Sequence, residues 1–103
     1  MKIVNTFSLA ALALVTLGAA VPPAPRVEIK QFAFGPRTLT VPVGATVTWV
    51  NEDEEPHTVT ATGVFASRGL DHDETFSYRF TTAGQVTYFC ALHPRMTGTV
   101  VVK

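Results

Sequence analysis

Apolar side chains recur at every second position in several short runs within residues 26–103, and this alternation limits the folds open to the chain. Val47 and Trp49 share one face of such a run, and Val86 and Cys90 share a face of another. A period of two is typical of strands with one buried face, and turn residues separate the runs. The pattern predicts an all-β fold, an antiparallel β-sandwich of about seven to eight strands with no substantial helix.

Local features refine this expectation. After Ile29 the apolar phase shifts to Phe32 and Phe34, which predicts a β-bulge near Lys30–Gln31. Leu39, Val41 and Val43 alternate, and Pro42 between them cannot donate a backbone hydrogen bond, so this strand is expected at a sheet edge.

The N-terminal segment differs from the rest of the chain. Residues 1–20 combine Lys2, a mostly apolar run over 7–17 and a small-residue end, which is typical of a cleaved export signal. The alternative is an uncleaved membrane anchor, but the run is short for a bilayer span of about 20 residues. Residues 21–25 form a Pro-rich spacer, and residues 26–103 are expected to be the folded domain.

Charge and cysteine content exclude some classes of protein. Eight basic and eight acidic residues leave no excess of positive charge, so the chain gives no argument for binding nucleic acid. A single cysteine, Cys90, cannot form an internal disulfide. In an exported protein a lone thiol is open to oxidation unless it is buried or bound to a metal.

Cys90 begins the pattern Cys-x2-His-x2-Met with His93 and Met96, and a second histidine, His57, lies upstream. One thiolate and two imidazoles with a weak thioether form the donor set of copper sites that transfer electrons. Taken singly, each of these residues is more often structural than a ligand. Together they predict one copper site made by His57, Cys90, His93 and Met96.

Two other polar groups have competing interpretations. His72, among acidic neighbours, is interpreted as a surface residue, with a weak second metal site involving Asp71 or Asp73 as the alternative. The acidic stretch Glu52–Glu55 is interpreted as a solvated turn, with steering toward a basic partner as the alternative.

Three segments together resemble the cupredoxins, the type 1 blue copper proteins, and within them the amicyanin and plastocyanin-like group. The segments are residues 44–51, 56–59 and 88–98. The resemblance implies a Greek-key cupredoxin-like sandwich and the same four copper ligands. It also implies that Asn51 supports the site without touching the metal, by linking the His57 segment to the Cys90 loop.

The chain departs from the family pattern at two positions. Ala91 stands where relatives often have Thr or Ser, so that side-chain hydrogen bond is lost, although a backbone bond could remain. Arg95 stands where amicyanin-like loops can carry an apolar residue, which puts a positive charge near the expected docking face.

These observations predict a small electron-transfer protein rather than an enzyme, with electrons passing through the exposed edge of His93 inside an apolar rim of Leu92 and Pro94. It is expected to be an exported periplasmic monomer without stable membrane insertion. Its partners would be transient redox proteins, and by resemblance an amine dehydrogenase as donor and a c-type cytochrome. The alternative is a copper-binding or delivery protein without a dedicated redox partner.

Overall fold

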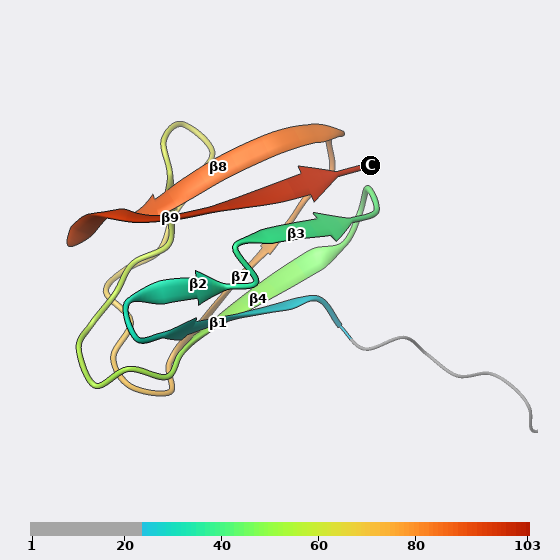
Figure 1. Ribbon diagram of the computed structural model, residues 1–103. Coiled ribbons are helices and arrows are strands. Elements are labelled where there is room, and N and C mark those ends of the chain that lie inside the picture. Colours follow the sequence, from blue (N-terminus) through green and yellow to red (C-terminus); the bar gives the residue numbers. More distant parts are fainter. Residues whose placement is uncertain (1–23) are drawn as a thin grey trace, which may run out of the picture.

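The computed structural model describes residues 24–103, which form two β-sheets stacked as a sandwich (Figure 1). One sheet has the order β2-β1-β4-β7, with strands Ala33–Gly35, Arg26–Lys30, Thr46–Asn51 and Thr75–Arg79. The other has the order β3-β9-β8-β5-β6, with strands Thr38–Val41, His93–Val102, Gly84–Cys90, Thr60–Ala61 and Phe65–Ala66. The described residues contain nine strands, two of them only two residues long, and no helix, so the all-β prediction is confirmed.

The predicted export signal, residues 1–20, lies outside the described residues, as does most of the predicted spacer. Within residues 24–103, no helix has the length and apolar character needed to cross a membrane.

Both sheets are mixed rather than purely antiparallel. Strand β1 runs parallel to β4, with Val27 opposite Trp49, and β3 runs parallel to β9, with Leu39 opposite Val100. The prediction of an antiparallel sandwich was therefore wrong for these two pairs. Alternation of apolar residues shows which face of a strand is buried, but it is the same for either strand direction.

A hairpin turn, and not a bulge, separates β1 from β2. Lys30 pairs with Ala33, and the two residues between them have left-handed backbone angles, with φ of 54° at Gln31 and 58° at Phe32. Two such residues in succession are typical of the tight turns that suit the twist of a hairpin. The turn leaves Phe32 45% exposed and Phe34 buried, whereas the sequence alternation had placed both on one face. Strand β3, before Pro42, does lie at the edge of its sheet, as predicted.

The core lies between the two sheets. The rings of Trp49 on β4 and Tyr88 on β8 are both fully buried and meet edge to face at 5.3 Å. Gly98 on β9 lies directly opposite Tyr88, and a Cβ at this position would overlap the Tyr88 hydroxyl. The other fully buried aliphatic side chains include Val27, Ile29, Val47, Val59 and Val100.

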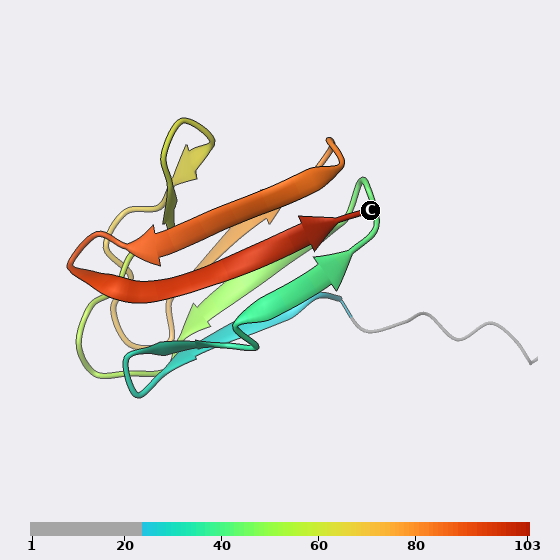
Figure 2. The ribbon, with the colours of Figure 1, turned by 45° about the horizontal axis from the view of Figure 1, so that its top comes forward.

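The β8–β9 hairpin positions the predicted metal ligands. Strand β8 ends at Cys90, a bulge interrupts its register there, and β9 begins at His93, which pairs with Cys90. Figures 1 and 2 show the β8–β9 turn at the same end of the sandwich as the β1–β2 turn and the long segment that follows β4. That end therefore gathers residues from three distant parts of the sequence.

Candidate metal centre

Three of the four predicted ligands converge at this end. Sγ of Cys90 lies 3.7 Å from Nδ1 of His57 and 3.7 Å from Nδ1 of His93. One ligand atom from each of the three residues lies within 4.8 Å of the others. His57 reaches the site from a bridge with Leu70 just before β5, while the other two come from the β8–β9 hairpin.

Burial differs among the ligand candidates. His57 and Cys90 are fully buried, whereas His93 is half-buried and has one side near solvent. Met96 is 6% exposed and lies three residues after His93 on β9, at the same end of the sandwich. A buried thiol facing two imidazole nitrogens, with a buried thioether close in sequence, has the donor chemistry that copper accepts in both oxidation states.

Thr58 joins the two halves of the site. Its amide donates a hydrogen bond to Sγ of Cys90 at 3.3 Å, and its hydroxyl accepts one from the Ala91 amide at 2.8 Å. The backbone of Ala91 therefore supplies a link, although its side chain cannot. Sequence reasoning missed Thr58; its position directly after a ligand histidine was the available signal.

Asn51 is fully buried and supports the segment that leads to His57. Its side-chain amide donates to the carbonyls of Glu55 at 2.9 Å and Leu70 at 2.8 Å, and its oxygen accepts from the Asp53 amide at 2.9 Å. The expected link between the His57 segment and the Cys90 loop is instead made by Thr58.

The acidic stretch is not uniformly solvated. The side chain of Glu54 is 84% exposed, whereas that of Asp53 is 11% exposed and its Oδ2 lies 2.8 Å from Nε2 of His57. Burial alone would raise the pKa of Asp53, but hydrogen bonds from the Phe32 and Gln31 amides and from His57 outweigh it and hold the pKa below its usual value. An ionised carboxylate thus lies against a predicted ligand. Sequence reasoning missed this contact, although a carboxylate four residues before a ligand histidine was a usable signal.

Exposed apolar side chains surround His93. Leu92 is 54% exposed, and the exposed Phe32 ring packs edge-on against His93 at 4.8 Å between centroids. Pro94 and Arg95 are also exposed. The predicted apolar rim thus gains Phe32, with a positive charge beside it.

His72 lies outside this cluster. Its side chain is 47% exposed, with Nε2 3.3 Å from the Asp73 carboxylate and Nδ1 3.2 Å from the Asp53 carbonyl. Donation to that carbonyl, first of all, raises the pKa of His72, and the nearby carboxylates of Asp73 and Glu54 act in the same direction. Among the described residues, His57, Cys90 and His93 form the one group of three His, Cys, Asp or Glu side chains close enough to share a metal ion.

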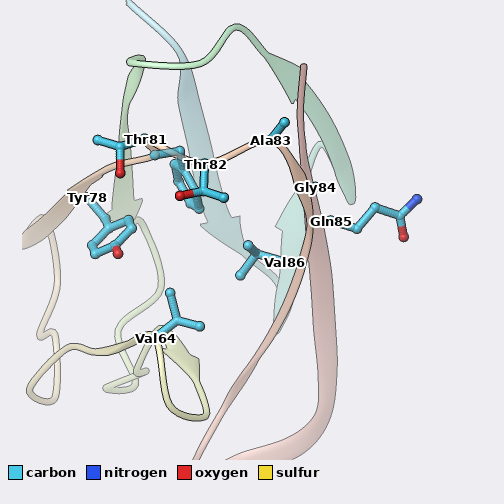
Figure 3. A pocket seen from close by; sticks show the side chains of 9 residues that line it. Val64, Tyr78, Thr81, Thr82, Ala83, Gly84, Gln85 and Val86 are labelled. Atoms are coloured by element: carbon cyan, nitrogen blue, oxygen red, sulfur yellow. The ribbon is translucent and has the colours of Figure 1, made fainter.

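A separate hollow of about 360 Å³ lies near the start of β8, at the far end of that strand from Cys90. Figure 3 shows Val64, Tyr78 and Val86 around it, while Gln85 points away. Its lining includes Phe80 and the turn 81–84 and has no His, Cys, Asp or Glu side chain.

Comparisons with known proteins agree with this geometry. Residues 3–102 match the family described as Cupredoxin-like domain. Amicyanin from Paracoccus denitrificans is 37% identical over 75% of this chain, which spans only 63% of that protein's length. Amicyanin-alpha from Methylorubrum extorquens is 33% identical over 95% of this chain and 87% of its own length.

A solved structure extends the likeness to the fold. The reduced Cu(I) form at pH 4 of a mutant of amicyanin superposes with a TM-score of 0.76 at 33% identity, over 82% of this chain and 86% of that one. Sequence family, fold and the clustered Cys and His side chains agree: this chain belongs to the cupredoxin-like family.

Proposed function

We propose that this protein is a small electron-transfer protein, with one type 1 copper held by His57, Cys90, His93 and Met96. The observation that carries the proposal is the approach of two imidazole Nδ1 atoms to within 3.7 Å of the buried Cys90 sulfur. Met96 would add a weak thioether donor to the other three. Copper bound there supplies a one-electron couple between Cu(II) and Cu(I).

The protein's contribution is to hold the ligands in one arrangement for both oxidation states. His57 lies in a bridge with Leu70, while Cys90 and His93 pair across the β8–β9 hairpin. The Thr58 amide bonds to the Cys90 sulfur, which limits its movement and tunes its electron density. A site that moves little when its charge changes has a low cost of rearrangement, and this favours fast transfer.

His93 is the proposed route for electrons, because it is the ligand imidazole that reaches the surface. The exposed side chains of Leu92 and Phe32 beside it offer a small apolar contact area. Small contact areas suit transient redox complexes, which have to separate quickly. The protein would act as a monomeric carrier without substrate chemistry of its own.

The redox partners are proposed from the relatives. An amine dehydrogenase as donor and a c-type cytochrome as acceptor are the candidates, and the exported chain would meet them in the periplasm. The exposed Arg95 favours a partner surface with negative charge beside its apolar contact area.

Copper addition tests the function directly. Wild-type protein titrated with Cu(II) is expected to develop an intense blue absorption band at one equivalent, because thiolate-to-copper charge transfer needs the Cys90–Cu bond. Cys90→Ser is expected to lose this band while keeping the far-UV circular dichroism of the sandwich. A pale spectrum from the wild type, like that of Cys90→Ser, would contradict the proposal. Rapid loss of copper to a weak chelator would instead favour the delivery alternative.

A further inference from the structure

The Asp53 carboxylate accepts hydrogen bonds from three donors. Its Oδ1 accepts from the Gln31 amide at 2.7 Å, and its Oδ2 accepts from the Phe32 amide at 2.9 Å. Oδ2 also lies 2.8 Å from Nε2 of His57. A carboxylate that accepts from two amides is an acceptor for His57 as well, so Nε2 donates, and in the neutral imidazole Nδ1 then carries no proton. Nδ1 is the atom that faces the Cys90 sulfur.

The two amides belong to a turn that the chain would not adopt readily by itself. Gln31 and Phe32 have φ of 54° and 58°, a region that side chains other than glycine rarely occupy. Such conformations persist when surrounding contacts hold them in place. Asp53, more than 20 positions further along the chain, supplies that contact to both amides at once.

The turn decides where the Phe32 ring lies. The ring packs edge-on against His57, with centroids 5.0 Å apart and planes at 88°, and against His93, at 4.8 Å and 86°. It is 45% exposed, while His57 is fully buried. Phe32 thus lies between solvent and the His57 imidazole and also touches the half-buried ring of His93.

We propose that Asp53 is a positioning residue of the metal centre with two linked tasks. It fixes the tautomer of His57 so that Nδ1 is free to bind metal, and it anchors the Gln31–Phe32 turn so that Phe32 packs against both imidazoles. The metal part of this proposal rests on the proposed function, whereas both tasks exist in the metal-free protein. Ligand histidines commonly donate their second nitrogen to a carboxylate, which fixes the ring and raises its basicity.

The test begins with metal-free protein at neutral pH. Long-range ¹H–¹⁵N spectra of the wild type are expected to show His57 as a single tautomer protonated at Nε2, with nuclear Overhauser contacts between Phe32 and both imidazoles. Asp53→Ala is expected to lose the single tautomer and these contacts. Asp53→Asn keeps the size of the side chain but replaces one acceptor oxygen with a donor, which then faces either the Gln31 amide or the Phe32 amide and His57. Either orientation removes an acceptor from the Gln31–Phe32 turn, so the contacts of Phe32 with both imidazoles are expected to weaken even if Asp53→Ala does not fold.

Two control variants show whether the signatures depend on Asp53 itself rather than on a neighbouring negative charge or on the Phe32 ring. Glu54→Gln removes a neighbouring carboxylate that is 84% exposed, and it is expected to leave both signatures as in the wild type. Phe32→Ala removes the ring but not the amide that bonds to Asp53, so the His57 tautomer is expected to persist. The proposal is overturned if Asp53→Asn keeps both signatures, or if Glu54→Gln changes them equally.

Copper affinity then separates this proposal from the proposed function. Competition with a chelator is expected to show a loss of roughly 10- to 100-fold for Asp53→Asn, the usual effect of removing such a partner, and no comparable loss for Glu54→Gln. Equal affinities in the two variants would overturn the positioning role at the metal. If the wild type itself forms no blue copper complex while the metal-free signatures are as expected, the proposed function fails and the two tasks of Asp53 stand.

Discussion

The two ends of strand β8 are built in different ways. At the Cys90 end, three polar residues are buried: Asn51 and Thr58 bond to the distant Leu70 and Ala91, and His57 bonds to Asp53, four residues before it. At the Gly84 end, the turn residues 81–84 are exposed, and distant segments are joined by bonds such as that from the Gly44 amide to the Phe80 carbonyl at 2.6 Å.

The difference shows that a small domain can hold its buried polar groups at one end while a shared core packs the two sheets together. Buried polar groups are costly without partners, so a polar end requires a complete hydrogen-bond network. The rings of Trp49 and Tyr88 lie between the two ends and pack the sheets together. The shared core supports an end with a buried hydrogen-bond network and an end with exposed turns in one sandwich.

Gly98→Ala is expected to have the largest effect, because it disturbs the core that both ends share. The added Cβ would overlap the hydroxyl and ring of Tyr88, which is itself fully buried. The free energy of unfolding should fall by about 3 kcal/mol, measured by urea denaturation. Gly69→Ala is the matched control, since nothing lies within 4 Å of a Cβ there. Equal stability of the two variants would show that the core adjusts freely.

Thr58→Val should weaken only the Cys90 end. It removes the hydroxyl that accepts from the Ala91 amide at 2.8 Å while keeping the shape of the side chain. The free energy of unfolding should fall by about 1 kcal/mol, because a part-buried amide loses its acceptor. Hydrogen exchange of the Ala91 amide should become faster. Thr82→Val, at the exposed turn of the other end, should change stability by no more than about 0.5 kcal/mol. If the Ala91 amide stays protected, Thr58 is not what joins the two segments.

The smallest expected effect concerns His72, beside the acidic stretch. Its pKa should lie above the ordinary value of 6.5, chiefly because the ring donates to the Asp53 carbonyl. A raised pKa in the folded state stabilises the protein below the unfolded pKa, and this contribution disappears as the pH rises through the folded pKa. An NMR titration of His72 checks the direction, and His72→Gln should remove this part of the pH dependence of stability. A pKa at or below 6.5 would mean that the carbonyl contact does not form in solution.

Much of the metal end could be predicted from the sequence because its donors are chemically distinctive. A lone cysteine with histidine and methionine at fixed short spacings indicated the ligand cluster, and the structure brings Cys90 and both histidines together. Strand alternation likewise predicted the all-β sandwich and the buried pair Val47 and Trp49. These features depend on residue chemistry and on local geometry, which the sequence carries directly.

Other features depended on how distant segments meet. Alternation of apolar residues does not show whether the β1–β4 and β3–β9 pairs are parallel or antiparallel, because both arrangements bury the same face. Asp53 looked like part of a solvated acidic turn until the fold placed it against the turn 31–32 and against His57. Phe32 looked like a core residue, but a left-handed turn places it outside the core, against the imidazoles of His57 and His93.

The sequence by itself indicated the proposed donor set and determined the class of fold, since soft donors at short spacing and a period of two each have few physical explanations. Only the tertiary structure decided which carboxylate, hydroxyl and ring support those donors. Such partners can lie far apart in the chain, as Thr58 and Cys90 do at a separation of 32. Their contacts depend on the packing of the whole sandwich and not on any local pattern.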